Sequence, residues 1–172
     1  APIPIPAGRI ADGGTPAWFV NDTSSVNGST RIYSQTPSDA DIALGNAIGW
    51  VLSIVLRVPT SDVTDDGTIF AAYRDGAHSW QMNFGHDAQG DTVVKLFTNT
   101  SGSLDGPTFT VAGNSEYNEF ALVYDPIAMT ADLWVNGSEE ISNYGGLPGE
   151  QVGNAKAVLW GAGRSVIQGE GR

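Results

Sequence analysis

The chain has 172 residues, which favours a single domain, 1–172, with enough residues to bury a core. Its formal net charge is −11 and no basic stripe offsets it, which argues against nucleic acid and against an anionic membrane surface as partners. It contains no cysteine, so disulfides, thiol catalysis and thiolate metal sites are excluded.

The first part of the chain is rich in turn and loop residues. Residues 1–16 contain much Pro, Ala and Gly and are predicted to form an extended N-terminal arm. A first strand is predicted at 18–20, a loop at 21–30 and a short strand at 31–34. Residues 37–41 have the composition of a helix cap followed by one helical turn.

The longest strand candidate covers residues 48–58, whose side chains alternate with a period of two. One face carries Trp50, Leu52, Ile54, Leu56 and Val58, and the other carries Val51, Ser53, Val55 and Arg57. Pro59 ends this strand.

Five shorter strands are predicted at 68–74, 79–85, 92–98, 108–111 and 157–161, separated by turn residues. In the second of these, the alternation places Trp80, Met82 and Phe84 on one face and Ser79, Gln81 and Asn83 on the other. The tryptophans fall mainly on inward-facing positions, which favours a core role.

A hairpin is predicted at 116–136, because two alternating arms flank a turn at Asp125-Pro126. A second reversal follows at Asn136-Gly137, where both residues tolerate positive φ. Trp134 lies on the face opposite Leu133, so it is either buried between two layers or an exposed aromatic platform.

About ten short strands without an internal repeat indicate an all-β sandwich or barrel. The runs NEFALVYD (118–125) and ADLWVNG (131–137), the strands at 50–58 and 68–70, and LWGAGR (159–164) resemble the concanavalin A-like lectin/glucanase superfamily and its laminin G-like domains. The resemblance covers about residues 45–170. It implies a jelly-roll β-sandwich of two antiparallel sheets.

Proteins of this superfamily include sugar-binding modules, adhesive extracellular domains, glycoside hydrolases and polysaccharide lyases. The resemblance also implies a final strand beyond a segment like 169–172, where this chain stops. A second peptide that supplies this strand is therefore one hypothesis, and a truncated chain or a domain that closes without it is the other.

Secretion is expected, because the opening APIPIPAG resembles a processed mature terminus and no signal peptide or transmembrane run is present. Four N-glycosylation sequons, at Asn21, Asn27, Asn99 and Asn136, permit passage through a glycosylating pathway.

Catalytic motifs are absent from the sequence. The glucanases of the superfamily carry paired acids as Glu-x-Asp-x-x-Glu, and no such run occurs here. Glu116 and Glu119 are three residues apart, which predicts opposite strand faces. We therefore expect a secreted, lectin-like domain that binds carbohydrate without chemistry of its own. A glycoside hydrolase or lyase with an unrecognised site, and an adhesive module without a sugar site, are the alternatives.

The candidate metal site is a cluster of hard oxygen ligands at Asp62, Asp65 and Asp66, suited in kind to calcium. Its spacing matches no EF-hand, and the run Asp-Asp-Gly is also common turn chemistry.

The candidate ligand-binding residues are polar side chains on successive strands: Arg57, Arg74, Gln81, Asn83 and His86. If these strands are neighbours, the side chains converge on one sheet face. Two arginines in an acidic protein are suited to a bidentate grip on a carboxylate, as in sialic or uronic acids. Polar residues on the solvent side of a sandwich are the simpler alternative.

Overall fold

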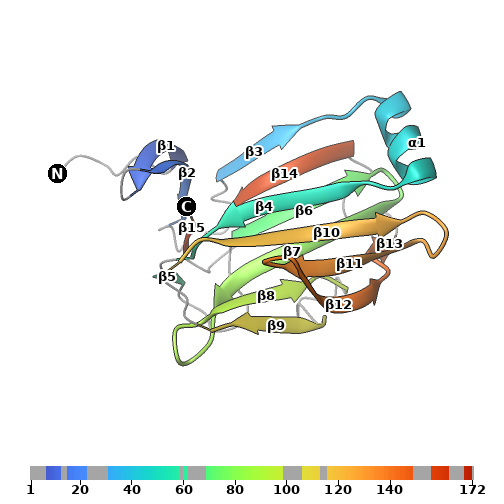
Figure 1. Ribbon diagram of the computed structural model, residues 1–172. Coiled ribbons are helices and arrows are strands. Elements are labelled where there is room, and N and C mark those ends of the chain that lie inside the picture. The colour runs from blue at the N-terminus through green and yellow to red at the C-terminus, as the bar shows by residue number, and fades with distance from the viewer. Residues whose placement is uncertain are drawn as a thin grey trace.

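The protein is a β-sandwich of two antiparallel sheets that pack face to face, with a small third sheet at one end (Figure 1). The structure is a computed structural model, and it describes residues 7–12, 15–22, 31–58, 60–61, 69–98, 106–112, 116–148, 156–162 and 169–171. This architecture is compatible with a jelly roll, so the predicted fold class is confirmed.

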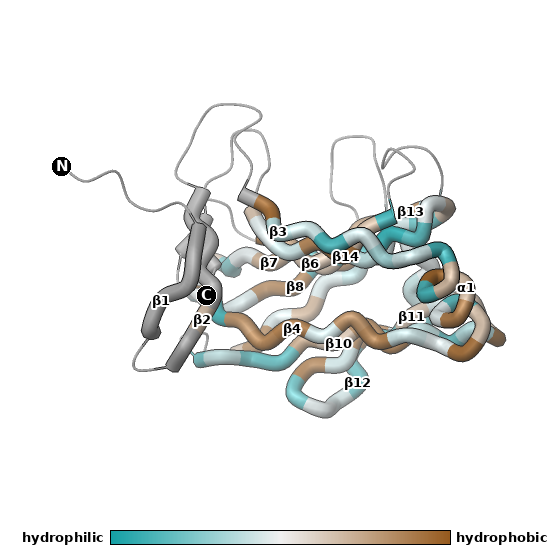
Figure 2. Tube along the Cα trace, turned by 90° about the horizontal axis from the view of Figure 1, so that it is seen from above, coloured by the Kyte–Doolittle hydropathy of each residue, from teal (hydrophilic) through white to brown (hydrophobic). Residues whose placement is uncertain are grey.

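The larger sheet has the order β3-β14-β6-β7-β8-β9, with β13 beside β7. Its strands are β3 (Arg31–Gln35), β6 (Ile69–Asp75), β7 (His78–His86), β8 (Thr92–Leu96), β9 (Thr108–Val111), β13 (Leu147–Pro148) and β14 (Lys156–Ala162). We call this the seven-stranded sheet. It forms one layer in Figure 2.

The other layer is a four-stranded sheet with the order β12-β11-β10-β4. Its strands are β4 (Val51–Leu56), β10 (Asn118–Asp125), β11 (Thr130–Val135) and β12 (Ser138–Tyr144). The predicted hairpin is confirmed as β10 and β11, which pair from Phe120↔Val135 to Asp125↔Thr130. The Asp125 side chain accepts the Ile127 N–H at 2.7 Å, which is the turn chemistry predicted for this residue.

The small sheet has the order β1-β2-β15-β5 and lies at the end of the sandwich away from the helix (Figure 1). Its strands are β1 (Ala7–Asp12), β2 (Thr15–Asp22), β5 (Thr60–Ser61) and β15 (Gly169–Gly171). The segment predicted as an N-terminal arm thus contributes β1, which forms a hairpin with β2. The rest of that arm, residues 1–6, 13 and 14, lies outside the described residues.

The core lies between the two large sheets, because each strand turns alternate side chains inward. Phe84 of β7 and Phe120 of β10 are both fully buried, and their ring centroids are 5.0 Å apart across the two layers. Trp80 is also buried there, while Trp50 and Trp160 pack against the core with part of their surface exposed. A core role is thus confirmed for these three tryptophans.

The helix α1 (Asp39–Ile48) corrects the prediction of a single helical turn, because it runs for ten residues. Ser38 caps its first turn: its Oγ accepts the Asp41 N–H, and the Asp41 carboxylate accepts the Ser38 N–H in return. Gly49, with φ at 98°, ends the helix. Ile48 therefore belongs to α1, and the strand predicted at 48–58 is the shorter β4.

Trp134 is neither buried between the two layers nor an exposed aromatic platform, the two alternatives that the sequence left open. It lies on the outer face of the four-stranded sheet, since its neighbour Leu133 is fully buried in the core. The residue is half-buried, and its buried indole Nε1 has no hydrogen-bond partner among the described residues. It is therefore not a freely exposed platform.

Candidate functional site

Three of the predicted ligand-binding residues meet on the outer face of the seven-stranded sheet. Arg74 of β6 lies opposite Ser79 of the neighbouring β7, and Gln81 and Asn83 follow on the same side of β7. The inward positions between them, such as Met82, are buried in the core. The predicted convergence is therefore confirmed for Arg74, Gln81 and Asn83.

Hydrogen bonding fixes the orientation of the two amides. The Gln81 Nε2 donates to the Asn83 Oδ1 at 2.9 Å. This bond uses the acceptor of Asn83, and its buried Nδ2 donor has no partner in the part of the chain that the structure describes. The buried Ser79 Oγ and the Arg74 Nε also have no hydrogen-bond partner within the described ranges. Such groups are costly to leave unsatisfied, which makes this face chemically unlike an ordinary solvated surface.

The electrostatics of this face centre on Arg74. Its side chain is half-buried, and desolvation lowers the pKa of its guanidinium from the ordinary value. Within the described part of the chain it forms no ion pair, although the protein has 19 acidic residues against 8 basic ones. An anion beside the guanidinium would offset its desolvation.

Lys95 is a second cation on the same face, and the sequence analysis missed it. It lies on β8 opposite Asn83, and among the described residues it too has no carboxylate partner. The alternation of β8 could have revealed it, because Val94 and Leu96 on either side are buried.

Arg74, Gln81 and Lys95 form a diagonal across three adjacent strands, and all three keep part of their surface exposed. From strand spacing and rise, successive members are about 8 Å apart and the ends about 16 Å apart. We refer to these three residues as the Arg74–Lys95 diagonal. The amide of Gln81 thus lies between the cations of Arg74 and Lys95.

Arg57 and His86 do not join this group. Arg57 follows β4 in the other sheet, and its guanidinium lies 5.8 Å from the ring centroid of Tyr117. His86 ends β7 on the inward-facing alternation, and its Nε2 contacts the backbone oxygen of Val58. The expectation that both arginines grip one carboxylate is therefore wrong, because the sandwich core separates them.

The predicted calcium ligands Asp62, Asp65 and Asp66 lie outside the described residues, so this site stays a prediction. Within the described ranges, no group of three or more acidic or histidine side chains is arranged to hold a metal ion. In the same ranges, no helix is long and apolar enough to cross a membrane.

A second feature that the sequence did not reveal is a cluster of aromatic rings beside α1. Trp50, Tyr73, Trp80 and Tyr124 lie with ring centroids 4.7–6.0 Å apart. Burial, and then the charge of nearby Asp75, raise the pKa of both tyrosines. Two cavities flank this cluster, one of about 390 Å³ and one of about 500 Å³.

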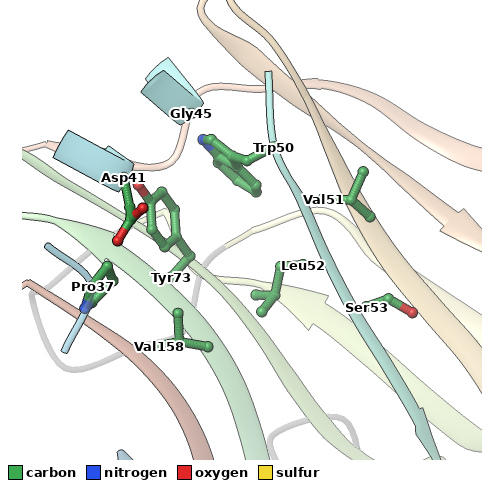
Figure 3. A pocket seen from close by; sticks show the side chains of 9 residues that line it. All are labelled: Pro37, Asp41, Gly45, Trp50, Val51, Leu52, Ser53, Tyr73 and Val158. Atoms are coloured by element: carbon green, nitrogen blue, oxygen red, sulfur yellow. The ribbon is translucent and has the colours of Figure 1, made fainter. Parts of the chain in front are cut away.

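The smaller cavity is the cleft between β4 and β14, shown in Figure 3. Leu52 of β4 and Trp50, which directly precedes this strand, line it on one side, and Tyr73 and Val158 line it from the seven-stranded sheet. Among the described strands, β4 is the last of its sheet, whereas β14 and β3 continue the opposite sheet beyond it (Figure 1), and the cleft lies at this step.

Comparison of the chain with known proteins finds neither a family model nor a curated protein that matches it.

Proposed function

We propose that this protein binds acidic carbohydrate through the Arg74–Lys95 diagonal, without chemistry of its own. The observation that carries the proposal is the pair of cations that lack carboxylate partners in the described structure of so acidic a protein. A guanidinium matches a carboxylate in a bidentate, charge-assisted contact. The amide of Gln81, between the two cations, is suited to sugar hydroxyls.

The spacing favours an oligosaccharide over a small anion. A span of about 16 Å between the two cations accommodates more than one charged residue of a polymer of uronic or sialic acids. Nucleic acid is a poorer match, because its dense phosphate charge requires many cationic contacts and the net charge of −11 repels it. The likeness to the lectin-like superfamily and the expected secretion agree with a glycan ligand.

A glycan array with neutral and carboxylated oligosaccharides tests this function. At about 0.15 M salt, the general repulsion of the protein is screened beyond about 8 Å, while short contacts remain. We expect binding to carboxylated glycans and unchanged chain length of the bound oligosaccharide after incubation. Absence of binding, or equal binding to neutral glycans, would contradict the proposal. A signal that disappears on chelation would support the predicted calcium site.

We also propose a peptide partner that adds a strand to the four-stranded sheet. Among the described strands, β4 pairs only with β10, so no described strand pairs with the backbone groups of its other edge. An added strand would cover the cleft against Trp50, Leu52 and Val158 (Figure 3). Native mass spectrometry of protein purified from its natural source tests this: a second, co-purifying peptide is expected, and a homogeneous single chain would refute it.

A further inference from the structure

The larger cavity, of about 500 Å³, lies beside α1 and the turns that follow β6 and β10. Its lining includes Asn46, Asp75, His78, Trp80, Tyr124 and Met129. It therefore joins one carboxylate to several aromatic rings. None of its residues belongs to the Arg74–Lys95 diagonal.

Asp75 is oriented by three hydrogen bonds. Its Oδ1 accepts the backbone N–H groups of Ala77 and His78 at 2.7 and 2.6 Å, and its Oδ2 accepts the Asn46 Nδ2 at 3.0 Å. The Oδ1 of the same Asn46 amide is buried, and no hydrogen-bond donor among the described residues reaches it. The polar groups that this pair offers to a ligand are consequently acceptors.

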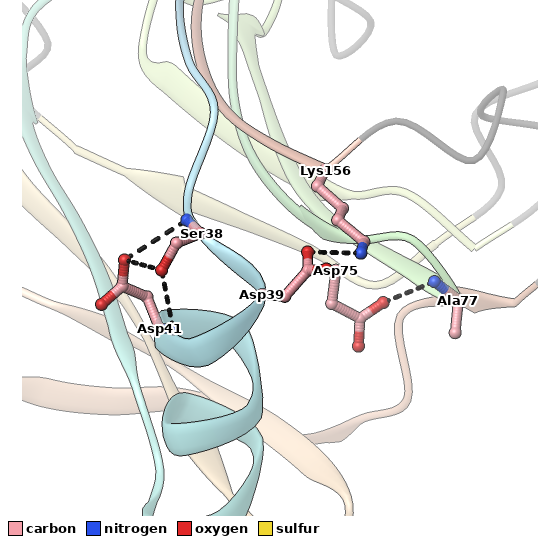
Figure 4. Close-up of polar contacts among 6 residues, drawn as sticks. All are labelled: Ser38, Asp39, Asp41, Asp75, Ala77 and Lys156. Atoms are coloured by element: carbon pink, nitrogen blue, oxygen red, sulfur yellow. Dashed lines mark hydrogen bonds and ion pairs between the residues drawn. The ribbon is translucent and has the colours of Figure 1, made fainter.

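Among the described residues, no cation lies within ion-pair distance of the Asp75 carboxylate. The residue is only 9% exposed, and its register partner on β14 is Lys156. The Lys156 Nζ instead bonds the Asp39 Oδ1 of α1 at 2.6 Å, as Figure 4 shows. Within the described part of the chain, Asp75 forms no ion pair, and a buried unpaired charge is expensive.

The aromatic wall complements this carboxylate. Trp80 has the rings of His78 and Tyr124 at centroid distances of 5.3 Å each, and Tyr124 stacks on Trp50 at 5.0 Å with nearly parallel planes. These rings are held in place by their mutual packing before any ligand arrives. Aromatic faces attract cations through their quadrupoles, and the attraction increases when water is excluded.

From these contacts we infer that the cavity binds an organic ammonium ion with an apolar body. Asp75 supplies the counter-charge, the Asn46 Oδ1 accepts a hydrogen bond from a hydroxyl or N–H of the ligand, and Trp80 and Tyr124 contact its alkyl groups. The net charge of −11 adds a long-range attraction for cations.

Choline and its uncharged carbon isostere, 3,3-dimethylbutan-1-ol, form a matched pair of probes. Each is titrated into the whole chain, and binding is monitored by NMR. Choline is expected to shift the backbone amides of Ala77, His78 and Met129, and the alcohol is expected to bind at least about tenfold more weakly. Equal binding of the two probes, no binding of choline, or shifts confined to other regions would overturn the inference.

An Asp75→Asn variant keeps a side-chain oxygen that accepts the Ala77 and His78 N–H groups, and it removes the negative charge. It is expected to weaken choline binding about tenfold or more, while leaving binding of acidic oligosaccharide unchanged. Arg74→Gln should weaken binding of acidic oligosaccharide and leave choline binding unchanged. The two variants therefore test the two proposed sites independently. If Asp75→Asn does not fold, the choline–alcohol comparison on the unaltered chain decides alone.

Discussion

The hydroxyl of Tyr144 links the two sheets across the core, and its removal is the most informative stability test. Tyr144 ends β12 of the four-stranded sheet, and only 3% of its surface is exposed. Its O–H donates to the backbone oxygen of Phe97 at 2.6 Å and accepts the Gln81 N–H at 3.2 Å. Both partners belong to the seven-stranded sheet: Gln81 lies in β7, and Phe97 directly follows β8.

Tyr144→Phe keeps the ring but removes the partner of one donor and one acceptor. The Phe97 oxygen then loses its donor in a buried setting, and the Gln81 N–H loses its acceptor. An unsatisfied buried group costs about 1–3 kcal/mol, and water entry or relaxation lowers the total. We therefore expect a loss of about 2 kcal/mol in the free energy of unfolding.

Urea unfolding followed by tryptophan fluorescence and by circular dichroism measures this loss, provided that the m-value is unchanged. Tyr124→Phe is the matched control, because no hydrogen bond of the Tyr124 hydroxyl is found among the described residues, and we expect a change below about 0.5 kcal/mol. If both variants lose the same stability, the hydroxyl of Tyr144 does not link the sheets.

The same residue predicts a dependence on alkaline pH. Burial raises the pKa of Tyr144 above the ordinary 10.0, so above that pH the unfolded state releases a proton that the folded state keeps. Stability is thus fully present below pH about 10 and falls above it, by about 1.4 kcal/mol per pH unit for one such group. Tyr144→Phe should show a shallower fall in urea titrations between pH 9 and 11. An identical slope in both proteins would contradict this cause.

Two backbone predictions can be measured by the same urea assay. Gly49→Ala should lower the free energy of unfolding by about 1–3 kcal/mol, because φ is 98° and a Cβ would lie 2.9 Å from the Tyr124 backbone oxygen. Gly137→Ala should lower it less, because φ is 83° but the space around the residue is open. The reverse order of the two losses would contradict the steric cause. Asn136, at φ 51°, donates from Nδ2 to the Asn118 Oδ1 at 2.8 Å. The Asn136 Oδ1 also accepts the Glu119 N–H at 3.0 Å. Asn136→Gly should therefore lose these two side-chain bonds without strain, and Asn136→Ala should be less stable still, by about 1 kcal/mol; equal stability of the two variants would count against strain.

The alternation of single strands predicted much of the site, because it depends only on backbone geometry. Arg74, Gln81 and Asn83 were assigned to one face from a period of two, and the turn at Asp75-Gly76 made β6 and β7 neighbours. His86 shows the limit of that reasoning. It is an even number of residues from Trp80, so its side chain points to the core face of β7. Gln81 points to the outer face, and closeness in sequence therefore did not bring the two side chains together.

Sheet membership could not be predicted from the same patterns. Arg57 directly follows β4 and Arg74 lies on β6, the next long strand of the chain, yet β4 and β6 belong to opposite sheets. Pairing between distant strands decides this, since β10 joins β4 from more than sixty residues away in sequence. Helix α1 was underestimated although Ser38 and Asp41 have capping-box spacing, because glycine at position 45 and a short apolar pattern weakened the helical signal.

The most direct test of the central claim is calorimetric titration of an oligosaccharide of hexuronic acids into two variants, Arg74→Gln and Lys156→Gln. Each removes one positive charge, but Lys156 already pairs with Asp39 on the surface. Loss of a bidentate, charge-assisted contact predicts about 10- to 100-fold weaker binding for Arg74→Gln and nearly unchanged binding for Lys156→Gln. Equal affinities of both variants and the unaltered protein would contradict recognition through the Arg74–Lys95 diagonal.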